Sequence, residues 1–377
     1  MNRMTRANYR PTIKICATSD FTTDYRIFKT GHSLNEAGFQ ISYVGRKRHD
    51  FHKNLPKPFP IHLLNTWKEK GPLFYVLFNL RLFLFLLYYP ADIIFSVDSD
   101  TLPACLLAGK LRKRPVVFDS HEYFPEVPEL HDRPFIKNIW KTLDRLFIKR
   151  IDAGITVCQS IARIYKEKYN IPFEVVRNLP LANRSNQTAM RKNNKVFTLI
   201  YQGALNVGRG LEQSIRAMQL IDNAQLIIIG DGDITDQLKQ LVIDLKLQEK
   251  VLFTGKLPFE QLPAYTQSAD LGLSLLENRG LNYYYALPNR IFDFIQAGLP
   301  ILAIDFPEIS RVVKKYNVGN CISSMDPTEI ATAVNAIRHN PEQLNLWQRN
   351  TRQAASQLTW ENESRLLTTL VNDLSPS

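Results

Sequence analysis

The sequence predicts an α/β protein with two domains, each built on a doubly wound parallel sheet flanked by helices. Short apolar runs alternate with amphipathic segments along most of the chain, which is the order of βαβ units. At 377 residues the chain is too long to fold around one hydrophobic core of ordinary size. A polar stretch without periodicity, residues 181–195, interrupts the alternation, which then restarts. We therefore expect domains at 1–180 and 196–355, a linker at 181–195, and a C-terminal helix, 356–377, that packs back on the first domain.

Composition and charge narrow the class of protein. Hydrophobic residues make up 45% and charged residues 22%, which is ordinary for a folded chain. The net charge of +11 suggests an anionic partner, and because no nucleic-acid-binding signature is present we expect phosphorylated substrates or an anionic membrane face. Four widely spaced cysteines indicate a reducing compartment and no structural zinc, and the N-terminus does not form a secretory signal. We therefore expect a cytoplasmic protein.

The first half alternates strands and helices. Strands are expected at 12–18, 39–44, 91–97, 115–118, 153–157 and 173–176, and helices at 25–37, from 103, at 136–150 and at 160–169. A basic loop, 46–60, is open to two interpretations: it grips an anionic substrate or head group, or it is a solvated loop.

Residues 73–89 form the most apolar stretch of the chain, with Asn79 and Arg81 near its middle. A membrane span needs ~20 apolar residues with few or no charges, so we do not expect a span. Two interpretations remain. The helix is buried against the sheet with Arg81 extended to water, or it lies at a bilayer interface on the inner membrane face.

Polar residues follow two strands of the first half. Asp20 follows the first strand, and Asp119, His121 and Glu122 follow strand 115–118. Ligand sites of α/β folds lie at the carboxyl ends of parallel strands, so we expect Asp20 and Glu122 to lie at a ligand site. His121 is either catalytic or structural, because a histidine beside two carboxylates suits both.

The second half repeats the alternation. Strands are expected at 196–201, 225–229, 251–254, 269–275 and 301–304, and helices at 211–220, 236–245, 259–268, 290–297, 330–339, 342–358 and 360–374. Glycine turns or positive charges follow several of these strands, at Gly203, Arg209, Gly230, Lys256 and Arg290. If the sheet is parallel, these groups meet at one edge and surround a diphosphate.

Residues 284–305 contain several features that together indicate a ligand site. Asn289 is expected to cap the helix that begins at Arg290, and Gly298 to close it. Free N–H groups and the helix dipole then attract a phosphate, and Asp293, one turn on, accepts hydrogen bonds from two ribose hydroxyls. In the alternative, Asp293 only complements the dipole and Arg290 is a solvated charge.

The order of these motifs resembles that of the GT-B glycosyltransferases, specifically the retaining family 4 group. The resemblance rests on YQGALNVGRGLEQSIRAM, LIIIGDGD, VLFTGKLPFEQLPAYTQSADLGLSL and LPNRIFDFIQAGLPILAIDFPEI in the second half, and on FDSHEYFPE, IDAGITVCQSIARIYKEKY and VVRNLP in the first. It implies two Rossmann-like domains facing a cleft, with the donor nucleotide sugar mainly on the second. No metal or other cofactor is expected.

The resemblance also implies residue roles. The second Glu of the family's Glu-seven residues-Glu pattern matches Asp293, and the first falls on Tyr285, so Asn282 or Glu277 is a candidate substitute. The phosphate-loop Arg falls on Ala204 and the later Lys on Arg209.

Three further positions follow from the resemblance. Lys256 or Arg290 is a candidate for the missing charge of the phosphate loop, and His121 matches the family's first-domain His, which implies a role near the donor sugar or acceptor.

The implied function is transfer of a sugar from a nucleoside diphosphate to a glycan or lipid-linked acceptor, with retention, in cell-surface polysaccharide or glycolipid synthesis. Arg209, Lys256 and the helix end at Arg290 are then expected to stabilise the leaving diphosphate, and Asp20 and Glu122 to lie on the acceptor side. Two alternatives stay open: a GT-B nucleotide-sugar epimerase, and a nucleotide-sugar-binding protein without turnover.

Overall fold

The computed structural model describes residues 9–19, 24–47, 59–68, 71–127, 130, 133–182 and 196–375. The chain forms two compact units, unit 1 (Met1–Asn178 with Glu363–Ser377) and unit 2 (Leu179–Asn362). The last fifteen residues thus belong with the N-terminal unit, and the change of unit falls inside helix α14 (Trp360–Asp373). Most of the expected linker, residues 183–195, lies outside the described residues.

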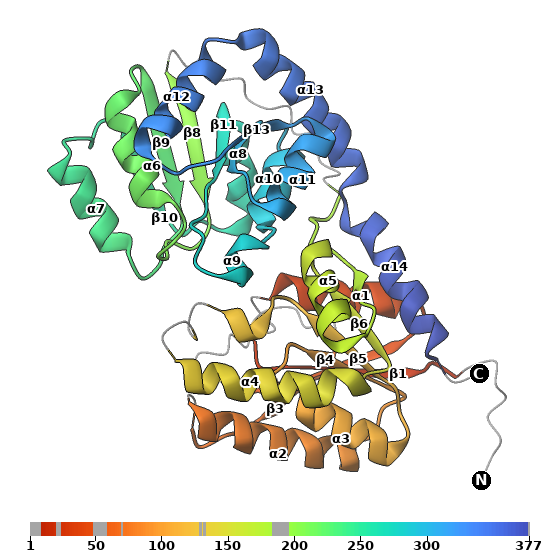
Figure 1. The fold of residues 1–377 in the computed structure, drawn as a ribbon. Coiled ribbons are helices and arrows are strands. Elements are labelled where there is room, and N and C mark those ends of the chain that lie inside the picture. The colour runs from red at the N-terminus through yellow and green to blue at the C-terminus, as the bar shows by residue number, and fades with distance from the viewer. Residues whose placement is uncertain are drawn as a thin grey trace. The chain divides into compact units, whose positions relative to one another are not determined.

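Unit 1 is built on a seven-stranded parallel sheet of order β3-β2-β1-β4-β5-β6-β7 (Figure 1). The strands are β1 Thr12–Ala17, β2 Gln40–Arg46, β3 Ile61–Leu64, β4 Ile93–Val97, β5 Val116–Ser120, β6 Ala153–Thr156 and β7 Glu174–Val175. The sheet order reverses between β1 and β4, which is the switch point where α/β folds place ligand sites. Strand β3 was not expected from the sequence, because it has only four residues and none of them is fully buried.

The helices of unit 1 are α1 Tyr25–Glu36, α2 Pro72–Tyr88, α3 Leu102–Arg112, α4 Pro134–Phe147 and α5 Gln159–Tyr169, with short 3₁₀ turns at Phe124–Glu126 and Ile148–Arg150. The Asp24 side chain caps α1 by accepting a hydrogen bond from the Ile27 N–H at 3.2 Å. Arg177 makes a bidentate ion pair with Glu363 of α14 (2.8 and 2.7 Å), which ties the C-terminal helix to the end of the unit 1 sheet.

Helix α2 confirms the expected helix in the most apolar stretch. Phe74, Phe78, Leu82 and Leu86, spaced four residues apart, are buried. The other side of the helix is also apolar but exposed, so the expectation of burial holds for one side only. Within the described ranges, no helix is both long enough and apolar enough to cross a bilayer.

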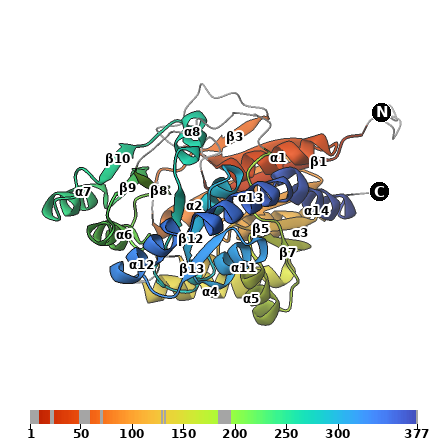
Figure 2. The same ribbon diagram turned by 90° about the horizontal axis from the view of Figure 1, so that it is seen from above.

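Unit 2 is built on a six-stranded parallel sheet of order β10-β9-β8-β11-β12-β13 (Figure 2 gives a second view). Its strands are β8 Phe197–Gln202, β9 Ala224–Ile229, β10 Val251–Gly255, β11 Leu271–Ser274, β12 Ile301–Ile304 and β13 Gly319–Ile322. Its helices are α6 Leu211–Ala217, α7 Thr235–Asp244, α8 Leu262–Gln267, α9 Leu281–Tyr284, α10 Asn289–Gln296, α11 Pro307–Tyr316, α12 Pro327–Arg338 and α13 Pro341–Gln357. Two apolar clusters, one on each side of this sheet, form its core.

Candidate functional site

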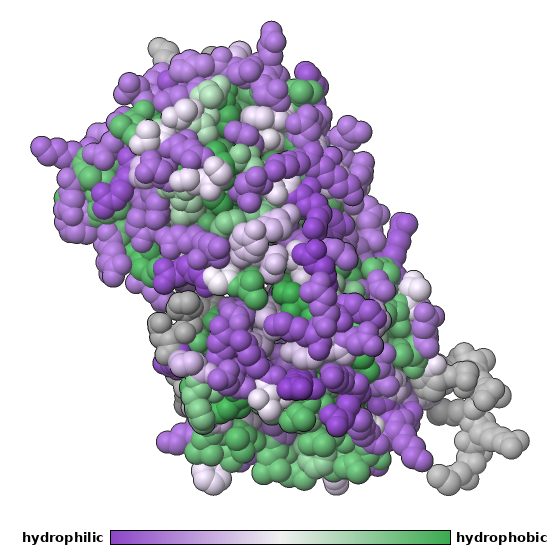
Figure 3. Space-filling view, viewed as in Figure 1, coloured by the Kyte–Doolittle hydropathy of each residue, from purple (hydrophilic) through white to green (hydrophobic). Residues whose placement is uncertain are grey.

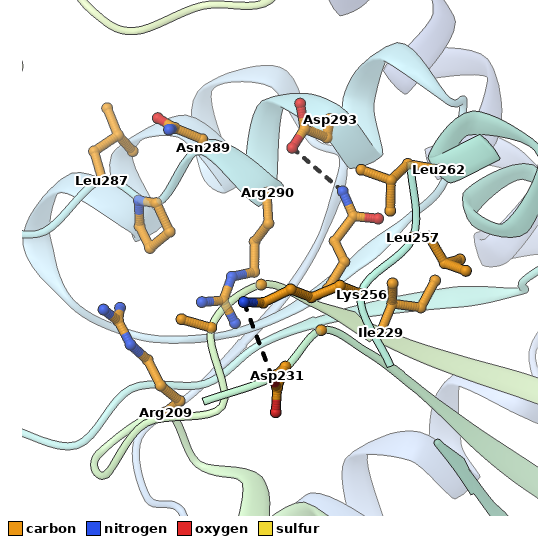
Figure 4. A pocket seen from close by; sticks show the side chains of 15 residues that line it. Arg209, Ile229, Asp231, Lys256, Leu257, Leu262, Leu287, Asn289, Arg290 and Asp293 are labelled. Atoms are coloured by element: carbon orange, nitrogen blue, oxygen red, sulfur yellow. Dashed lines mark hydrogen bonds and ion pairs between the residues drawn. The ribbon is translucent and has the colours of Figure 1, made fainter. Parts of the chain in front are cut away.

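A pocket of about 750 Å³ opens in unit 2 where β8, β9 and β10 end and α10 begins (Figure 4). Fifteen residues line it: Gln202, Gly203, Ala204, Arg209, Ile229, Gly230, Asp231, Lys256, Leu257, Leu262, Leu287, Pro288, Asn289, Arg290 and Asp293. Seven of the residues singled out in the sequence therefore meet at one place: Gly203, Arg209, Gly230, Lys256, Asn289, Arg290 and Asp293. They meet because parallel strands present their carboxyl ends at one edge of the sheet.

The floor of the pocket is glycine backbone. Gly203 and Gly230 have φ angles of +138° and +136°, which side chains other than glycine rarely allow. A Cβ on Gly230 would lie 1.9 Å from the Gly203 carbonyl oxygen, so the two strand ends approach each other only because position 230 has no side chain. The Gly203 N–H donates to the Ile229 carbonyl at 3.0 Å, which holds the two strand ends together. A ligand can therefore approach the backbone closely here.

Arg290, the second residue of α10, is the most buried cation of the pocket. Its side chain is 7% exposed, and its guanidinium lies 4.2 Å from the centre of the Tyr201 ring. Its Nη1 is buried without a hydrogen-bond partner among the described residues. Burial lowers the pKa of Arg290 and the nearby charge of Arg209 lowers it further, while Tyr201 opposes the shift. A buried donor left without an acceptor costs free energy, so this position is prepared for an anion.

Arg209 and Lys256 add two cations of different character. The Arg209 guanidinium lies 5.0 Å from the Tyr283 ring centre, and its Nε is also buried without a partner among the described residues. Lys256 is 79% exposed and lies 3.9 Å from the Asp231 carboxylate, a contact that water screens strongly (Figure 4). Its ammonium can therefore turn toward a ligand at little cost.

The start of α10 corrects one expectation. Asn289 is not the N-cap: that position is Pro288, which has no side-chain capping bond, and Asn289 is the first helical residue. Proline fixes φ, here at −63°, and the Pro288 carbonyl accepts the first turn's hydrogen bond from the Ile291 N–H at 3.1 Å. Asn289 and Arg290 precede this bond in the first turn of the helix, and both residues line the pocket.

Asp293 lies one turn further along α10. Its Oδ2 accepts a hydrogen bond from Gln202 Nε2 at 3.2 Å (Figure 4). Gln202 Oε1 in turn accepts a hydrogen bond from Thr266 Oγ1 at 2.8 Å. Gln202, which the sequence analysis did not single out, thus holds the carboxylate in place from the end of β8. A glutamine at the last position of a buried strand was the signal that could have identified it.

The candidates for the missing carboxylate lie elsewhere in unit 2. Asn282 is buried on α9 and does not line this pocket. Glu277 also lies outside the lining, where it accepts a hydrogen bond from Gln213 and pairs with Arg279 at 3.1 Å. Tyr285 is half-buried, with its ring centre 5.1 Å from that of Tyr284. Ala204 does line the pocket.

A second polar cluster lies at the carboxyl edge of the unit 1 sheet. Arg26 Nη2 pairs with Asp119 Oδ1 at 2.7 Å, both fully buried, and Asp119 Oδ2 lies 3.1 Å from His121 Nε2. The backbone N–H of His121 donates a hydrogen bond to Asp98 Oδ1 at 2.9 Å. Glu122, the neighbour of His121, is half-buried. Asp20 lies outside the described residues.

The charges of this cluster are strongly coupled. Burial disfavours the charged form of His121, but the carboxylates of Asp119 and Asp98 outweigh it and raise the pKa of His121 to about 9. Burial also opposes ionisation of Asp119, yet Arg26 and His121 hold the pKa of Asp119 well below its ordinary value. Burial raises the pKa of Asp98 to about 8, so near neutral pH Asp119 is the carboxylate that chiefly favours the charged form of His121. His121 is therefore a protonated donor near neutral pH, oriented by a carboxylate that stays ionised.

Two family models match the chain. The model described as glycosyl transferases group 1 covers residues 183–354, and the one described as glycosyltransferase family 4 covers residues 26–180. The chain is a GT-B glycosyltransferase of the family 4 kind. This glycosyltransferase superposes with a TM-score of 0.78 on the Anabaena protein HepE in complex with UDP and glucose, over 97% of its own length and 100% of that chain, at 15% identity.

Two named relatives align with this chain over a smaller share of its length. The glycosyltransferase is 24% identical over 311 residues to a chitobiosyldiphosphodolichol beta-mannosyltransferase of Candida albicans, which covers 73% of this chain and 65% of the relative. It is 26% identical over 138 residues to a GDP-mannose-dependent alpha-(1-6)-phosphatidylinositol monomannoside mannosyltransferase of Mycolicibacterium smegmatis, which covers 35% of this chain and 36% of the relative. The chain thus spans between about a third and two thirds of the length of these relatives.

Proposed function

We propose that this protein transfers a sugar from a nucleoside diphosphate sugar to a glycan or lipid-linked acceptor, with retention, in cell-surface polysaccharide or glycolipid synthesis. The observation that carries the proposal is the group of three cations, Arg209, Lys256 and Arg290, around a glycine-backbone floor in one pocket. Two of the three have buried donor atoms without a partner among the described residues. A diphosphate supplies the acceptors that these donors lack.

The same cations suit the chemical step. When the bond between the anomeric carbon and the diphosphate breaks, negative charge grows on the departing oxygen. Fixed cations in a partly buried pocket stabilise that charge without reorganising during the reaction. Arg290 and Arg209 are held over aromatic rings, so their positions are set before the donor binds.

The nucleoside end fits the other side of the pocket. Asp293, held by Gln202, accepts hydrogen bonds from two ribose hydroxyls, and the side chains of Leu257 and Leu262 offer an apolar surface for the base. The Anabaena protein binds UDP and glucose, and the Mycolicibacterium relative is named for GDP-mannose. We therefore propose a UDP- or GDP-sugar as the donor.

The acceptor is proposed from unit 1 and from the relatives. Protonated His121, oriented by Asp119, is suited to donate a hydrogen bond to a hydroxyl of the sugar or the acceptor. The two relatives carry diphosphodolichol and phosphatidylinositol in their names, which favours a lipid-linked acceptor. We place the reaction in the cytoplasm, with peripheral attachment at the inner membrane face, and we expect no metal requirement.

One experiment tests this proposal. The protein is incubated with a panel of UDP- and GDP-sugars, with and without a membrane lipid extract, while nucleotide binding, nucleotide release and the sugar products are followed. Nucleotide release that depends on the extract, with a product of retained anomeric configuration, supports the proposal. Interconversion of the free sugar indicates an epimerase instead, and binding without turnover indicates a binding protein. In the Asp293→Ala variant, unchanged nucleotide affinity would show that the site is assigned wrongly.

A further inference from the structure

We propose that the exposed side of α2, α3 and α4 in unit 1, named here the α2–α4 face, docks on a lipid bilayer leaflet that contains anionic phospholipid. The inference rests on the proposed function, because a lipid-linked acceptor has to be met at a membrane, and it goes beyond that function by naming the surface and the lipid class. Figure 3 shows hydrophobic side chains gathered over the part of unit 1 where α2 and α3 lie.

Helix α2 provides the centre of the face. A helix that covers a sheet normally turns polar side chains to water on its outer side. On α2 the outer positions are Leu73, Val76, Leu80 and Leu84, which are between 53% and 64% exposed. They lie opposite the buried stripe that begins at Phe74. The side facing away from the sheet is thus as apolar as the side that packs on it, which an aqueous surface does not explain.

Helices α3 and α4 extend the apolar surface. Helix α3 packs against both α2 and α4, so the three form one layer. Leu107 and Leu111 of α3 are 51% and 66% exposed. Phe135, Ile139 and Leu146 lie along one side of α4 and are 78%, 43% and 48% exposed. The same pattern recurs on three helices that pack against one another, so these exposed apolar side chains are not scattered single residues.

The exposed charges of the three helices are all positive. Lys110 and Arg112 lie exposed at the end of α3, Arg145 lies exposed on α4, and Lys149 and Arg150 lie exposed in the 3₁₀ turn that follows α4. The single carboxylate in the three helices is Asp144, which is 1% exposed. If two copies of this chain paired through this face, cations of one copy would lie against cations of the other. An anionic leaflet instead complements both the apolar and the cationic groups. The charge pattern therefore selects the membrane as the partner.

The geometry fits a surface contact. Helix α2 has 17 residues with Arg81 within it, and its last residue, Tyr88, is 78% exposed. Trp67, five residues before the helix in sequence, is 82% exposed. Trp and Tyr concentrate at the boundary between head groups and hydrocarbon. An apolar helix side with cations and aromatic rings beside it lies in the plane of the interface.

The test uses the full chain and vesicles of phosphatidylcholine with and without phosphatidylglycerol, with binding followed by co-sedimentation at low and high salt. The wild type is expected to bind the anionic vesicles, and its affinity for them is expected to fall at high salt. The apolar variant Leu80→Gln/Leu84→Gln/Leu111→Gln is expected to bind at least about tenfold more weakly. The charge variant Lys110→Gln/Lys149→Gln/Arg150→Gln is expected to bind anionic vesicles about a hundredfold more weakly, since each basic residue near an anionic surface contributes about 1 kcal/mol to the binding free energy.

A matched control replaces three exposed apolar residues of unit 2, Leu220→Gln/Ile243→Gln/Leu252→Gln, which are 51%, 51% and 44% exposed. It is expected to bind vesicles like the wild type. Equal binding by the apolar variant, or no anion dependence, overturns the inference. So does a dimer, seen by sedimentation velocity, that the apolar variant dissociates. Nucleotide affinity is measured on the same samples: vesicle binding without nucleotide binding would contradict the proposed function alone, and the reverse would contradict the docking face alone.

Discussion

Replacing Arg290 with methionine separates a binding role from a structural one. Methionine keeps apolar contact with Tyr201 but removes the cation. A hydrogen bond to a charged group contributes about 1.5–3 kcal/mol, so we expect nucleotide affinity to fall about 10- to 150-fold. In the free protein the guanidinium is 7% exposed with Nη1 unpartnered among the described residues. Its removal loses a cation–π contact of about 2 kcal/mol but also relieves a buried unpaired donor that costs about 1–3 kcal/mol.

The two terms nearly cancel, so the free energy of unfolding is expected to change by less than about 1 kcal/mol. Isothermal titration calorimetry with UDP and GDP gives the affinity, and denaturant unfolding without ligand gives the stability. Arg290→Lys, which keeps the charge but not the planar fork, is expected to lie between the wild type and Arg290→Met. Unchanged nucleotide affinity would refute the role of Arg290, and a large loss of stability would show that its role is structural.

Four further outcomes are expected. Lys256→Gln should weaken nucleotide binding by less than about fivefold in calorimetry, because the side chain is 79% exposed, and a loss larger than that of Arg290→Met would contradict this. Gly230→Ala should lower Tm, because its φ of +136° disfavours a side chain and the new Cβ would meet the Gly203 carbonyl; an unchanged Tm would argue against this geometry. His121 and Asp98 both have raised pKa values in the folded protein, so the folded state holds extra protons. Stability should therefore fall as pH rises, between about 4 and about 8 because of Asp98 and between about 6.5 and about 9 because of His121. Denaturant unfolding across these ranges checks this, and an identical pH slope in His121→Gln would count against it. Turnover should persist in EDTA, whereas a loss restored by Mg²⁺ would contradict the expectation of no metal.

Much of the fold was predictable because strand and helix periods differ clearly in this chain. The buried strands β4 and β9 read as apolar runs, and glycine or polar residues follow them. The helices α9 and α11 were not expected from the sequence, and two strands were missed because they are short and half-buried. Strand β3 and strand β13 have four residues each, and only one side chain of β13 is buried. Their place in the sheet is set by pairing with β2 and β12, which local sequence does not show.

The pocket was partly predictable for a topological reason. Arg209, Lys256 and Arg290 come from three separate strand–helix turns, and a parallel sheet is enough to bring such turns to one edge. The cap of α10 was not predictable from asparagine preference alone, because Pro288 already fixes the backbone there. Gln202 was missed because its contact with Asp293 joins residues 91 positions apart in sequence.

The most direct measurement is a crystal structure of this protein with bound UDP or GDP. We expect diphosphate oxygens within hydrogen-bond distance of the Arg209 and Arg290 guanidinium groups, and ribose hydroxyls on the Asp293 carboxylate. A nucleotide bound elsewhere, or a diphosphate that touches neither arginine, would contradict it.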